Sequence, residues 1–221
     1  MTVWVTRASP GAEATAARLT ARGFAAVIAP LLEVRPLSPA IDLTDIQALA
    51  FTSRNGVAVF AGLSDDRSLP VFTVGDATAR GAADAGFVTV RSAEGDLSAL
   101  AALIRAEASG LTILSPVAAE PAGDLAALVG NAARVRHVAV YETAETGASP
   151  PVAWNAVLIH SPRAARALAT VVPRGEGRLA VAISPAAAEP LSDLRFAQVR
   201  IASDPTEDAL LDALGKPWPA V

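Results

Sequence analysis

The alternation of short apolar runs with alanine- and leucine-rich stretches is the feature that most limits how this chain folds. The short runs carry β-branched residues and have the length of strands, whereas the stretches between them are long enough for helices. This order is typical of α/β folds, because a helix must carry the chain back between two parallel strands. The expected strands are 3–6, 26–29, 48–52, 71–74, 88–90, 112–114, 138–141, 156–159, 180–183 and 198–201.

A serine followed by a proline marks the expected start of several helices. The serine caps free N–H groups of the first turn, and proline fits the first helical position because its missing N–H needs no partner there. The first helix is expected to end near Arg22, since Gly23 has the form of a helix-ending glycine. Serine-proline pairs follow expected strands at Ser9, Ser115, Ser161 and Ser184.

The chain also resembles itself at an offset of about 108 residues. Residues 48–60 align with 156–168 and place Ser53 opposite Ser161. A similar shift aligns VWVTRASPGAEATAARL with TILSPVAAEPAGDLAAL, and FTVGDATARGA with VAISPAAAEPL. We interpret this repeat as a degenerate internal duplication.

Two segments rich in proline, serine or small residues, 33–41 and 142–151, are expected to be connections rather than strands or helices. The piece between them is long enough for a complete α/β domain, whereas each outer piece is incomplete. One assembly joins residues 1–34 and 148–221 into a discontinuous domain, with residues 38–142 inserted and linkers near 35–37 and 143–147. Two consecutive domains that divide near residue 108 are the alternative.

Composition excludes several classes of function. The chain has no cysteine and only two histidines, so we expect no disulfide, no thiolate nucleophile and no metal site. A single lysine and a net charge of -4 argue against nucleic-acid binding. No apolar run approaches the roughly 20 residues of a membrane span, and the N-terminus lacks the pattern of a signal peptide, so we expect a cytoplasmic protein.

Polar residues gather where the expected strands end. Ligands of parallel sheets bind beyond these carboxyl ends, where helix N-termini present free N–H groups. Hydroxyls, small residues and arginines dominate there, which suits a ligand with several carboxylates or phosphates. Each serine alone is equally well explained as a helix cap. The strand-end residues are Thr6, Arg7, Thr52, Ser53, Arg54, Asn55, Gly75, Asp76, Thr78, Ser115, His160, Ser161 and Ser184.

Tyr141, the only tyrosine, follows an expected strand beside the second connection. Its hydroxyl is therefore expected to face a cleft between domains, where a phenol can donate a proton to a departing hydroxyl. Packing at a hinge explains the residue equally well. His160 ends a strand and is a weaker candidate for a site base. No dinucleotide fingerprint, phosphate loop or nucleophile elbow is present.

Six short motifs resemble the uroporphyrinogen-III synthase family in order and spacing, over essentially the whole chain. The resemblance implies two doubly wound parallel-sheet α/β domains, the first discontinuous, joined by a two-stranded linker. The motifs are VTR (5–7), FTSRNGV (51–57), VGDATA (74–79), VAVYET (138–143), HSP (160–162) and ALLDAL (209–214).

The resemblance also implies an activity. Enzymes of this family convert hydroxymethylbilane, a linear tetrapyrrole with eight carboxylates, into a macrocycle whose ring D is inverted. They remove the terminal hydroxyl as water, through a spiro intermediate, and use no cofactor. Because two hinged lobes need no second subunit, we expect a monomer, and its expected protein contact is a transient one with the upstream hydroxymethylbilane synthase.

Position by position, the resemblance gives Tyr141 the role of assisting hydroxyl departure. Two departures from the family pattern concern substrate contacts. Ala186 and Ala187 stand where relatives often have threonines, and Ser115-Pro116 replaces an arginine-glycine pair. The expected substrate-binding residues are Arg7, Thr52, Ser53, Asn55, Gly75, Thr78, Ala79, Ser161 and Ser184.

Two other functions are compatible with the same residues. A non-catalytic, two-lobed binding protein for a polycarboxylate or tetrapyrrole would also need hinged α/β lobes and sites for anions. A transferase or lyase acting on a phosphorylated sugar or nucleotide would use the same strand ends. The lack of a phosphate loop and of a metal-binding carboxylate cluster counts against the latter.

Overall fold

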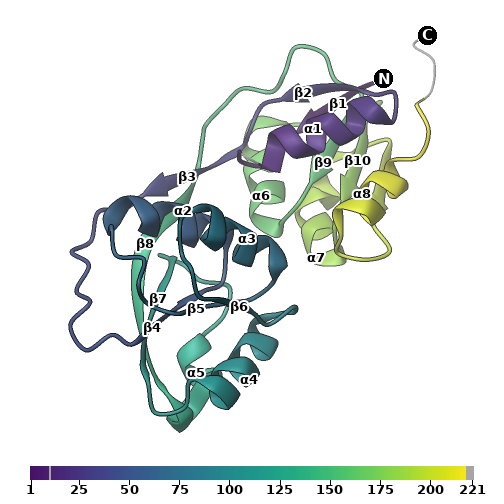
Figure 1. Cartoon of the computed structure of the whole chain (residues 1–221). Coiled ribbons are helices and arrows are strands. Elements are labelled where there is room, and N and C mark those ends of the chain that lie inside the picture. Colours follow the sequence, from purple (N-terminus) through teal and green to yellow (C-terminus); the bar gives the residue numbers. More distant parts are fainter. Residues whose placement is uncertain (10, 218–221) are drawn as a thin grey trace. The chain divides into compact units, whose positions relative to one another are not determined.

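The computed structural model describes residues 1–9 and 11–217, which form two compact units. The outer unit contains Met1–Glu33 and the chain from Ala144 onward, and the inner unit contains Val34–Thr143. Each unit has one sheet with helices on both faces (Figure 1). Because nearly all neighbouring strands pair in parallel, the structure confirms the predicted α/β class.

The outer unit has a five-stranded sheet in the order β11-β10-β9-β1-β2. The strands are β1 (Thr2–Val5), β2 (Ala25–Ile28), β9 (Ala156–Ile159), β10 (Leu179–Ala182) and β11 (Gln198–Ile201). The helices are α1 (Gly11–Ala21), α6 (Pro162–Val171), α7 (Pro185–Ala188), the 3-10 helix η2 (Glu189–Leu194) and α8 (Glu207–Leu214).

Side chains that alternate along β1 bury themselves on opposite faces of this sheet. Val3 and Val5 pack with α1 and α8, whereas Trp4 packs with α6 and α7. The central strands read as continuous apolar runs because both of their faces are covered. The edge strand β11 carries Gln198 and Arg200 instead, which suits its partly solvated position.

The inner unit has a six-stranded sheet in the order β3-β8-β7-β4-β5-β6. The strands are β3 (Leu32–Pro36), β4 (Ala48–Phe51), β5 (Val71–Thr73), β6 (Val90–Ser92), β7 (Thr112–Ala118) and β8 (Arg134–Glu145). The helices are α2 (Arg54–Leu63), α3 (Asp76–Asp84), α4 (Leu97–Glu107), α5 (Leu125–Val129) and the 3-10 helix η1 (Gly130–Ala132).

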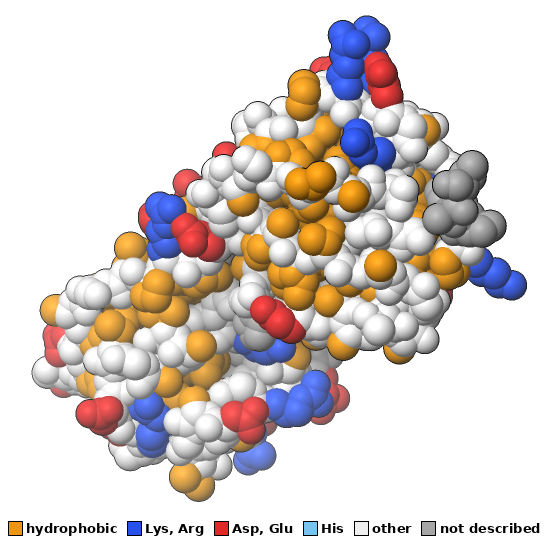
Figure 2. All heavy atoms as spheres, turned by 90° about the horizontal axis from the view of Figure 1, so that it is seen from above, with side chains coloured by type: hydrophobic (Ala, Val, Ile, Leu, Met, Phe, Trp, Pro, Cys, Tyr) orange, Lys and Arg blue, Asp and Glu red, His pale blue; other side chains and the backbone are white. Residues whose placement is uncertain are grey.

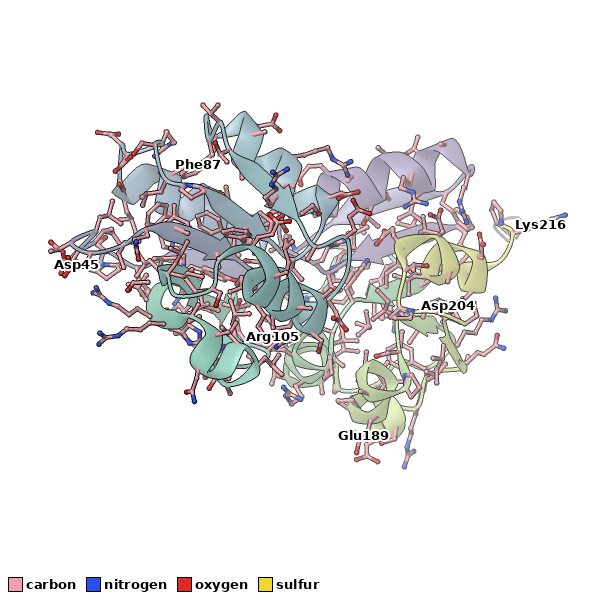
Figure 3. The ribbon with its side chains drawn as sticks, turned by 60° about the horizontal axis from the view of Figure 1, so that its bottom comes forward. Asp45, Phe87, Arg105, Glu189, Asp204 and Lys216 are labelled. Carbon is pink, nitrogen blue, oxygen red and sulfur yellow. The ribbon has the colours of Figure 1, made fainter. Side chains whose placement is uncertain are left out.

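Two apolar clusters hold the inner unit together, one on each face of its sheet. Helices α4 and α5 cover one face, and α2 and α3 cover the other. On the second face Phe51 packs edge-on against Phe60 at 5.6 Å between ring centroids. Phe87, labelled in Figure 3, lies 6.0 Å from Phe51, and the Arg67 guanidinium lies over the Phe87 ring at 4.9 Å from its centroid. This aromatic cluster fixes α2 against β4.

The predicted internal repeat corresponds to matching topology. The outer order β11-β10-β9-β1-β2 follows the inner order β6-β5-β4-β7-β8 when β9 is matched with β4 and β1 with β7, as the sequence alignment requires. Ser53 and Ser161 both have extended backbone and accept a hydrogen bond three residues on. The matched strands therefore occupy equivalent places in the two sheets.

Each expected strand overlaps a strand of the structure, although β6 shares only Val90 with the expected 88–90, and the two expected connections are partly strands. β3 lies within the first of them, and β8 continues into the second as far as Glu145. Thr146 N–H donates to Leu31 O and Leu37 N–H donates to Val140 O, a register that makes β3 antiparallel to β8. The proline content was misleading because β3 is an edge strand, where Pro36 removes no ladder bond on the open side.

The helix-start prediction holds at Ser161 and Ser184 but is wrong at Ser115. Ser161 and Ser184 each cap a helix through the side chain. At Ser115 the chain instead stays in β7, which pairs with β4 only at Ile113 and Leu114, so Pro116 lies beyond that ladder. Ser9 precedes Pro10, which lies outside the described residues, so that start is untested.

Gly23 ends the first helix as predicted. Its φ of 84° is left-handed, a conformation that favours glycine. Gly23 N–H donates to Thr20 O, and Phe24 N–H donates to Leu19 O. This is the Schellman pattern, and the buried side chains of Phe24 and Leu19 share one apolar cluster. The glycine therefore turns the chain directly into β2.

Gly56 sets how closely α2 approaches β7. A Cβ atom at this position would lie 2.9 Å from Pro116 O, a backbone atom that cannot rotate away. Gly62 lies in the same helix with nothing within 4 Å of its Cβ position. The two glycines therefore differ in packing although both are helical.

Gly56→Ala should lower the free energy of unfolding by about 1–3 kcal/mol, because the new methyl group must push the first turn of α2 away from β7. Gly62→Ala should instead raise it by about 0.5–1 kcal/mol, because alanine loses less backbone entropy in a helix. Urea unfolding followed by far-UV circular dichroism, which reports the helices and strands of both units, measures both. Equal effects for the two variants would contradict the close contact at Gly56.

Candidate functional site

A cavity of about 460 Å³ opens at the carboxyl ends of the central strands of the inner unit. The ends of β4 and β5, the start of α4, the loop after β7 and the side chains of β8 form its walls. A second hollow, near Gly110 and Arg134, lies by the amino ends of β7 and β8, the edge opposite to the one where ligands of parallel sheets bind. We therefore place the site in the former. Its lining residues are Thr52, Ser53, Val74, Asp96, Leu97, Ala118, Glu120, Pro121, Ala122, Gly123, Tyr141 and Thr143.

Tyr141 and Ser53 join two walls of this cavity. The Tyr141 hydroxyl lies 3.0 Å from Ser53 Oγ, within hydrogen-bond distance. Ser53 also caps α2, because its Oγ accepts from Gly56 N–H at 3.0 Å. Tyr141 is almost completely buried, with 7% of the residue exposed, and it is one of the residues that line the cavity. The Tyr141 side chain is therefore fixed by β8 at its backbone end and by Ser53 at its hydroxyl end.

The predicted site residues fall into separate groups. Tyr141, Thr52 and Ser53 line the cavity together. Four more belong to helix starts of the same unit but are not among the lining residues. Gly75 is the N-cap of α3 and offers no side-chain hydrogen bond, and Thr78 N–H donates to Gly75 O within the first turn. The four are Asn55, Gly75, Thr78 and Ala79.

Three predicted residues belong to the outer unit. Ser161 caps α6 by accepting from Ala164 N–H, and Ser184 caps α7 by accepting from Ala187 N–H. Both lie at carboxyl ends of neighbouring strands, β9 and β10. Arg7 follows β1 in the same sheet and forms an ion pair, described next.

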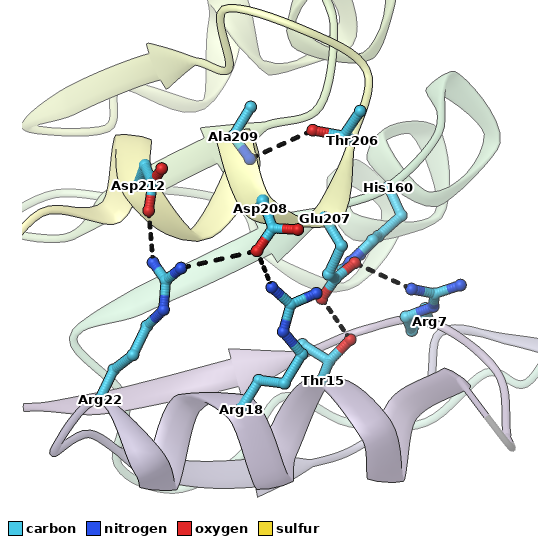
Figure 4. Close-up of polar contacts among 10 residues, drawn as sticks. All are labelled: Arg7, Thr15, Arg18, Arg22, His160, Thr206, Glu207, Asp208, Ala209 and Asp212. Atoms are coloured by element: carbon cyan, nitrogen blue, oxygen red, sulfur yellow. Dashed lines mark hydrogen bonds and ion pairs between the residues drawn. The ribbon is translucent and has the colours of Figure 1, made fainter.

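Glu207, the first residue of α8, connects three elements of the outer unit (Figure 4). Its Oε2 accepts from Arg7 Nη1 at 3.0 Å and lies 3.1 Å from His160 Nε2. Its Oε1 accepts from Thr15 Oγ1 at 2.6 Å. Since a carboxylate only accepts, His160 Nε2 carries the hydrogen, and the buried Nδ1 has no hydrogen-bond partner among the described residues.

The surroundings of Glu207 hold its carboxyl group ionised. Burial raises the pKa, but the hydrogen bonds from His160 and Thr15 and the charges of His160 and Arg7 outweigh it and lower the pKa to about 2. Next to this group, Arg18 pairs with Asp208 and Arg22 pairs with Asp212 at 2.7 Å, which ties α1 to α8. The guanidinium of Arg7 is therefore already paired with a protein carboxylate, that of Glu207.

Sequence reasoning did not identify Glu207, Thr15 or Asp96. Thr206 followed by acidic residues is a recognisable helix start, and Asp96 precedes a leucine-rich helix in the same way. Such patterns place a helix, but they do not say which distant side chains its first turn meets. Only the fold brings Glu207 to Arg7 and Thr15.

Other classes of site find no support in the described part of the chain. Within residues 1–9 and 11–217, no group of three or more histidine, aspartate or glutamate side chains could hold a metal ion. No helix in those residues is long and apolar enough to cross a membrane. On the face shown in Figure 2, lysine and arginine side chains stand in separate small groups.

Comparison with known proteins gives one consistent family. The model of a family described as uroporphyrinogen-III synthase HemD matches residues 13–212. The uroporphyrinogen-III synthetase of Helicobacter pylori has a similar structure, with a TM-score of 0.71, 19% identity, and coverage of 96% of this chain and 97% of that chain. None of the curated proteins matches the sequence.

A mutant uroporphyrinogen III synthase from the extremely thermophilic bacterium Thermus thermophilus is also similar, with a TM-score of 0.52 and 14% identity over 97% of this chain and 98% of that chain. At such identities the two structures establish the fold. The family assignment rests on the sequence match to residues 13–212.

Glu207→Gln should reduce the free energy of unfolding at pH 7 by roughly 1–3 kcal/mol, because it removes a carboxylate that is favoured by its partners. The folded-state pKa of about 2 lies below the ordinary value of 4.5. The stabilisation is therefore complete above pH 4.5 and is lost as the pH falls towards 2. Urea unfolding at several pH values measures the difference between the two proteins.

Asp208→Asn is the matched control, because the Asp208 side chain is 75% exposed although it also pairs with arginine. Its effect should be within about 0.5 kcal/mol. If Glu207→Gln matches this control, or if its effect persists unchanged at pH 2, Glu207 does not connect the elements as described.

Proposed function

The chain belongs to the uroporphyrinogen-III synthase family, and we propose that the cavity around Tyr141 is where the substrate loses its hydroxyl group. The protein is a hydro-lyase that converts hydroxymethylbilane into uroporphyrinogen III, with loss of water and inversion of ring D. The family match does not favour the alternative of a non-catalytic binding protein.

The observation that carries the site proposal is the position of the Tyr141 hydroxyl. Tyr141 and Ser53 both line the cavity at the carboxyl ends of the parallel strands, and the hydroxyl is fixed by its 3.0 Å contact with Ser53 Oγ. The electron pair of the terminal pyrrole breaks the C–O bond, and Tyr141 passes its proton to the departing oxygen, which leaves as water. The ring that remains is electron-deficient, and the far end of the tetrapyrrole attacks it.

Much of the remaining task is geometric. The unassisted chain closes to the non-inverted isomer, so the protein must hold the flexible substrate in the arrangement that leads to inversion. We propose that free N–H groups at helix starts bind its carboxylates, with Thr52, Gly75, Ser161 and Ser184 at four of these starts. Asn55, Thr78, Ala79 and Arg7 complete the proposed set.

The two positions where relatives often have threonines, Ala186 and Ala187, both lie in α7 of the outer unit. Ala187 is fully buried, whereas Ala186 is exposed. A threonine hydroxyl at position 186 would therefore be accessible to a ligand, and one at 187 would not. We propose that the loss of a contact at Ala186 weakens substrate binding and leaves the chemical step unchanged.

The wider setting follows from the same family. We propose that residues 1–34 with 148–221 and residues 38–142 are the two domains, linked near 35–37 and 143–147. We further propose a cytoplasmic monomer that uses no cofactor and meets hydroxymethylbilane synthase only as the substrate is released.

Tyr141→Phe should lower kcat roughly a hundredfold, because general acid catalysis by a positioned side chain contributes about 10²–10⁴-fold. KM should change little, since the ring remains. Hydroxymethylbilane is generated in place by its synthase, and the rate of uroporphyrinogen III formation is followed by chromatography of the oxidised products. A variant that unfolds like the wild type and keeps its kcat would remove Tyr141 from the mechanism.

A further inference from the structure

Ser53 reaches Tyr141 from the far side of an intervening strand. Ser53 follows β4, Tyr141 lies in β8, and β7 runs between these two strands. Neighbouring strands are about 4.8 Å apart, so the pair spans about 10 Å. Tyr141 is in register with Ala118 of β7, a small residue beside a β-bulge that leaves the phenol room to cross. The 3.0 Å contact therefore requires a specific sheet order as well as two suitable side chains.

The hydrogen-bonding capacity of Ser53 determines what it can do for the phenol. A serine hydroxyl has one hydrogen and two lone pairs. Gly56 N–H occupies one lone pair, which leaves one lone pair and the hydrogen for Tyr141. Ser53 can thus accept from the neutral phenol, and after rotation of its hydrogen it can donate to a phenolate. A bond to the charged form is about twice as strong as a bond between neutral groups.

The first turn of α2 gives Ser53 its position and a favourable dipole. Ser53 is the N-cap of a ten-residue helix whose positive end stabilises nearby negative charge. Gly56 packs this turn against Pro116 O of β7, so the cap is held close to the strand that separates it from β8. Ser53 is therefore held beside Tyr141 by the backbone N–H of Gly56, and the same turn is held by its contact with the backbone of β7.

We propose that Ser53 is a positioning residue that acts through Tyr141. It holds the phenol in the cavity and donates a hydrogen bond to the phenolate that forms as the substrate's C–O bond breaks. The departing oxygen takes the phenol proton and leaves as water, and the phenolate regains a proton from the ring D carbon when the macrocycle closes. This inference rests on the proposed role of Tyr141 and replaces the expected direct contact of Ser53 with substrate.

Three substitutions at position 53 separate this role from helix capping. Threonine keeps both the hydroxyl and the cap, glycine keeps most of the helix-start stability without a hydroxyl, and aspartate caps as well as serine but places a negative charge beside the phenol. We expect Ser53→Thr to stay within about threefold of the wild-type kcat. Ser53→Gly should lower kcat about ten- to hundredfold, and Ser53→Asp should lower it further, with KM nearly unchanged.

Wild-type kcat in the glycine and aspartate variants would reduce Ser53 to a helix cap and overturn the proposal. A raised KM with unchanged kcat would overturn it in favour of direct substrate binding. Urea unfolding of each variant checks that the fold is intact, and only folded variants enter the comparison.

A double-mutant cycle with Tyr141→Phe tests whether Ser53 acts through the phenol. Ser53→Gly should cause no further loss of kcat in the Tyr141→Phe background. The same fold-loss in both backgrounds would overturn the proposal but leave Tyr141 as the acid. If Tyr141→Phe alone keeps the wild-type rate, the proposed function of Tyr141 fails first, so the two failures are distinguishable.

The contact itself can be observed without substrate, because Tyr141 is the only tyrosine in the chain. Protein grown with ¹³Cζ-labelled tyrosine gives a single signal that reports the hydrogen bonding of the phenol oxygen. This signal should move in Ser53→Gly and stay near its wild-type position in Ser53→Thr. An unmoved signal in the glycine variant would contradict the hydrogen bond on which the proposal stands.

Discussion

Parallel strand pairing is the constraint on which the rest of this structure depends. It brings the carboxyl ends of adjacent strands to one edge of each sheet, and most of these ends are followed by a helix that returns the chain to the opposite edge. The same edge therefore collects free N–H groups, capping hydroxyls and short polar loops in both units. A fold that buries its apolar runs in this way creates binding edges without any dedicated motif.

The two units use this edge differently. In the inner unit, the hydroxyl-bearing residues Ser53, Thr52 and Tyr141 line a cavity together with two acidic residues, Asp96 and Glu120. In the outer unit, Glu207 draws Arg7 and His160 into an ion-paired cluster that connects α8 to the ends of two strands. The strand-end edge of the outer unit is thus stabilised by packing and ion pairing, whereas that of the inner unit retains polar side chains in a cavity.

Much of the fold was predictable because apolar periodicity and helix starts are local properties. Gly23, Ser161 and Ser184 each act within a few residues of their own position, and the structure confirms all three. Ser115-Pro116 has the same local form as Ser161-Pro162, but β8 pairs beside it and keeps the chain in a strand. Strand pairing is non-local, so the sequence pattern could not distinguish these two cases.

In the candidate site too, local features could be predicted from the sequence, whereas contacts made through tertiary structure could not. Tyr141 and Ser53 could be proposed from strand ends, but their hydrogen bond depends on the order β8-β7-β4 and on the close approach of Gly56 to Pro116. Glu207 could be recognised only as a helix-start residue, because its partners Thr15 and Arg7 lie almost 200 positions away. Side chains that meet through tertiary structure leave no mark on local spacing.

The product isomer is the most direct test of the central claim. Hydroxymethylbilane is generated in place by its synthase with and without this protein, and the oxidised uroporphyrins are separated by chromatography. Predominant type III in the presence of the protein is the expected result, against type I in its absence. Type I alone from a folded sample would contradict the assignment of uroporphyrinogen-III synthase activity to this chain.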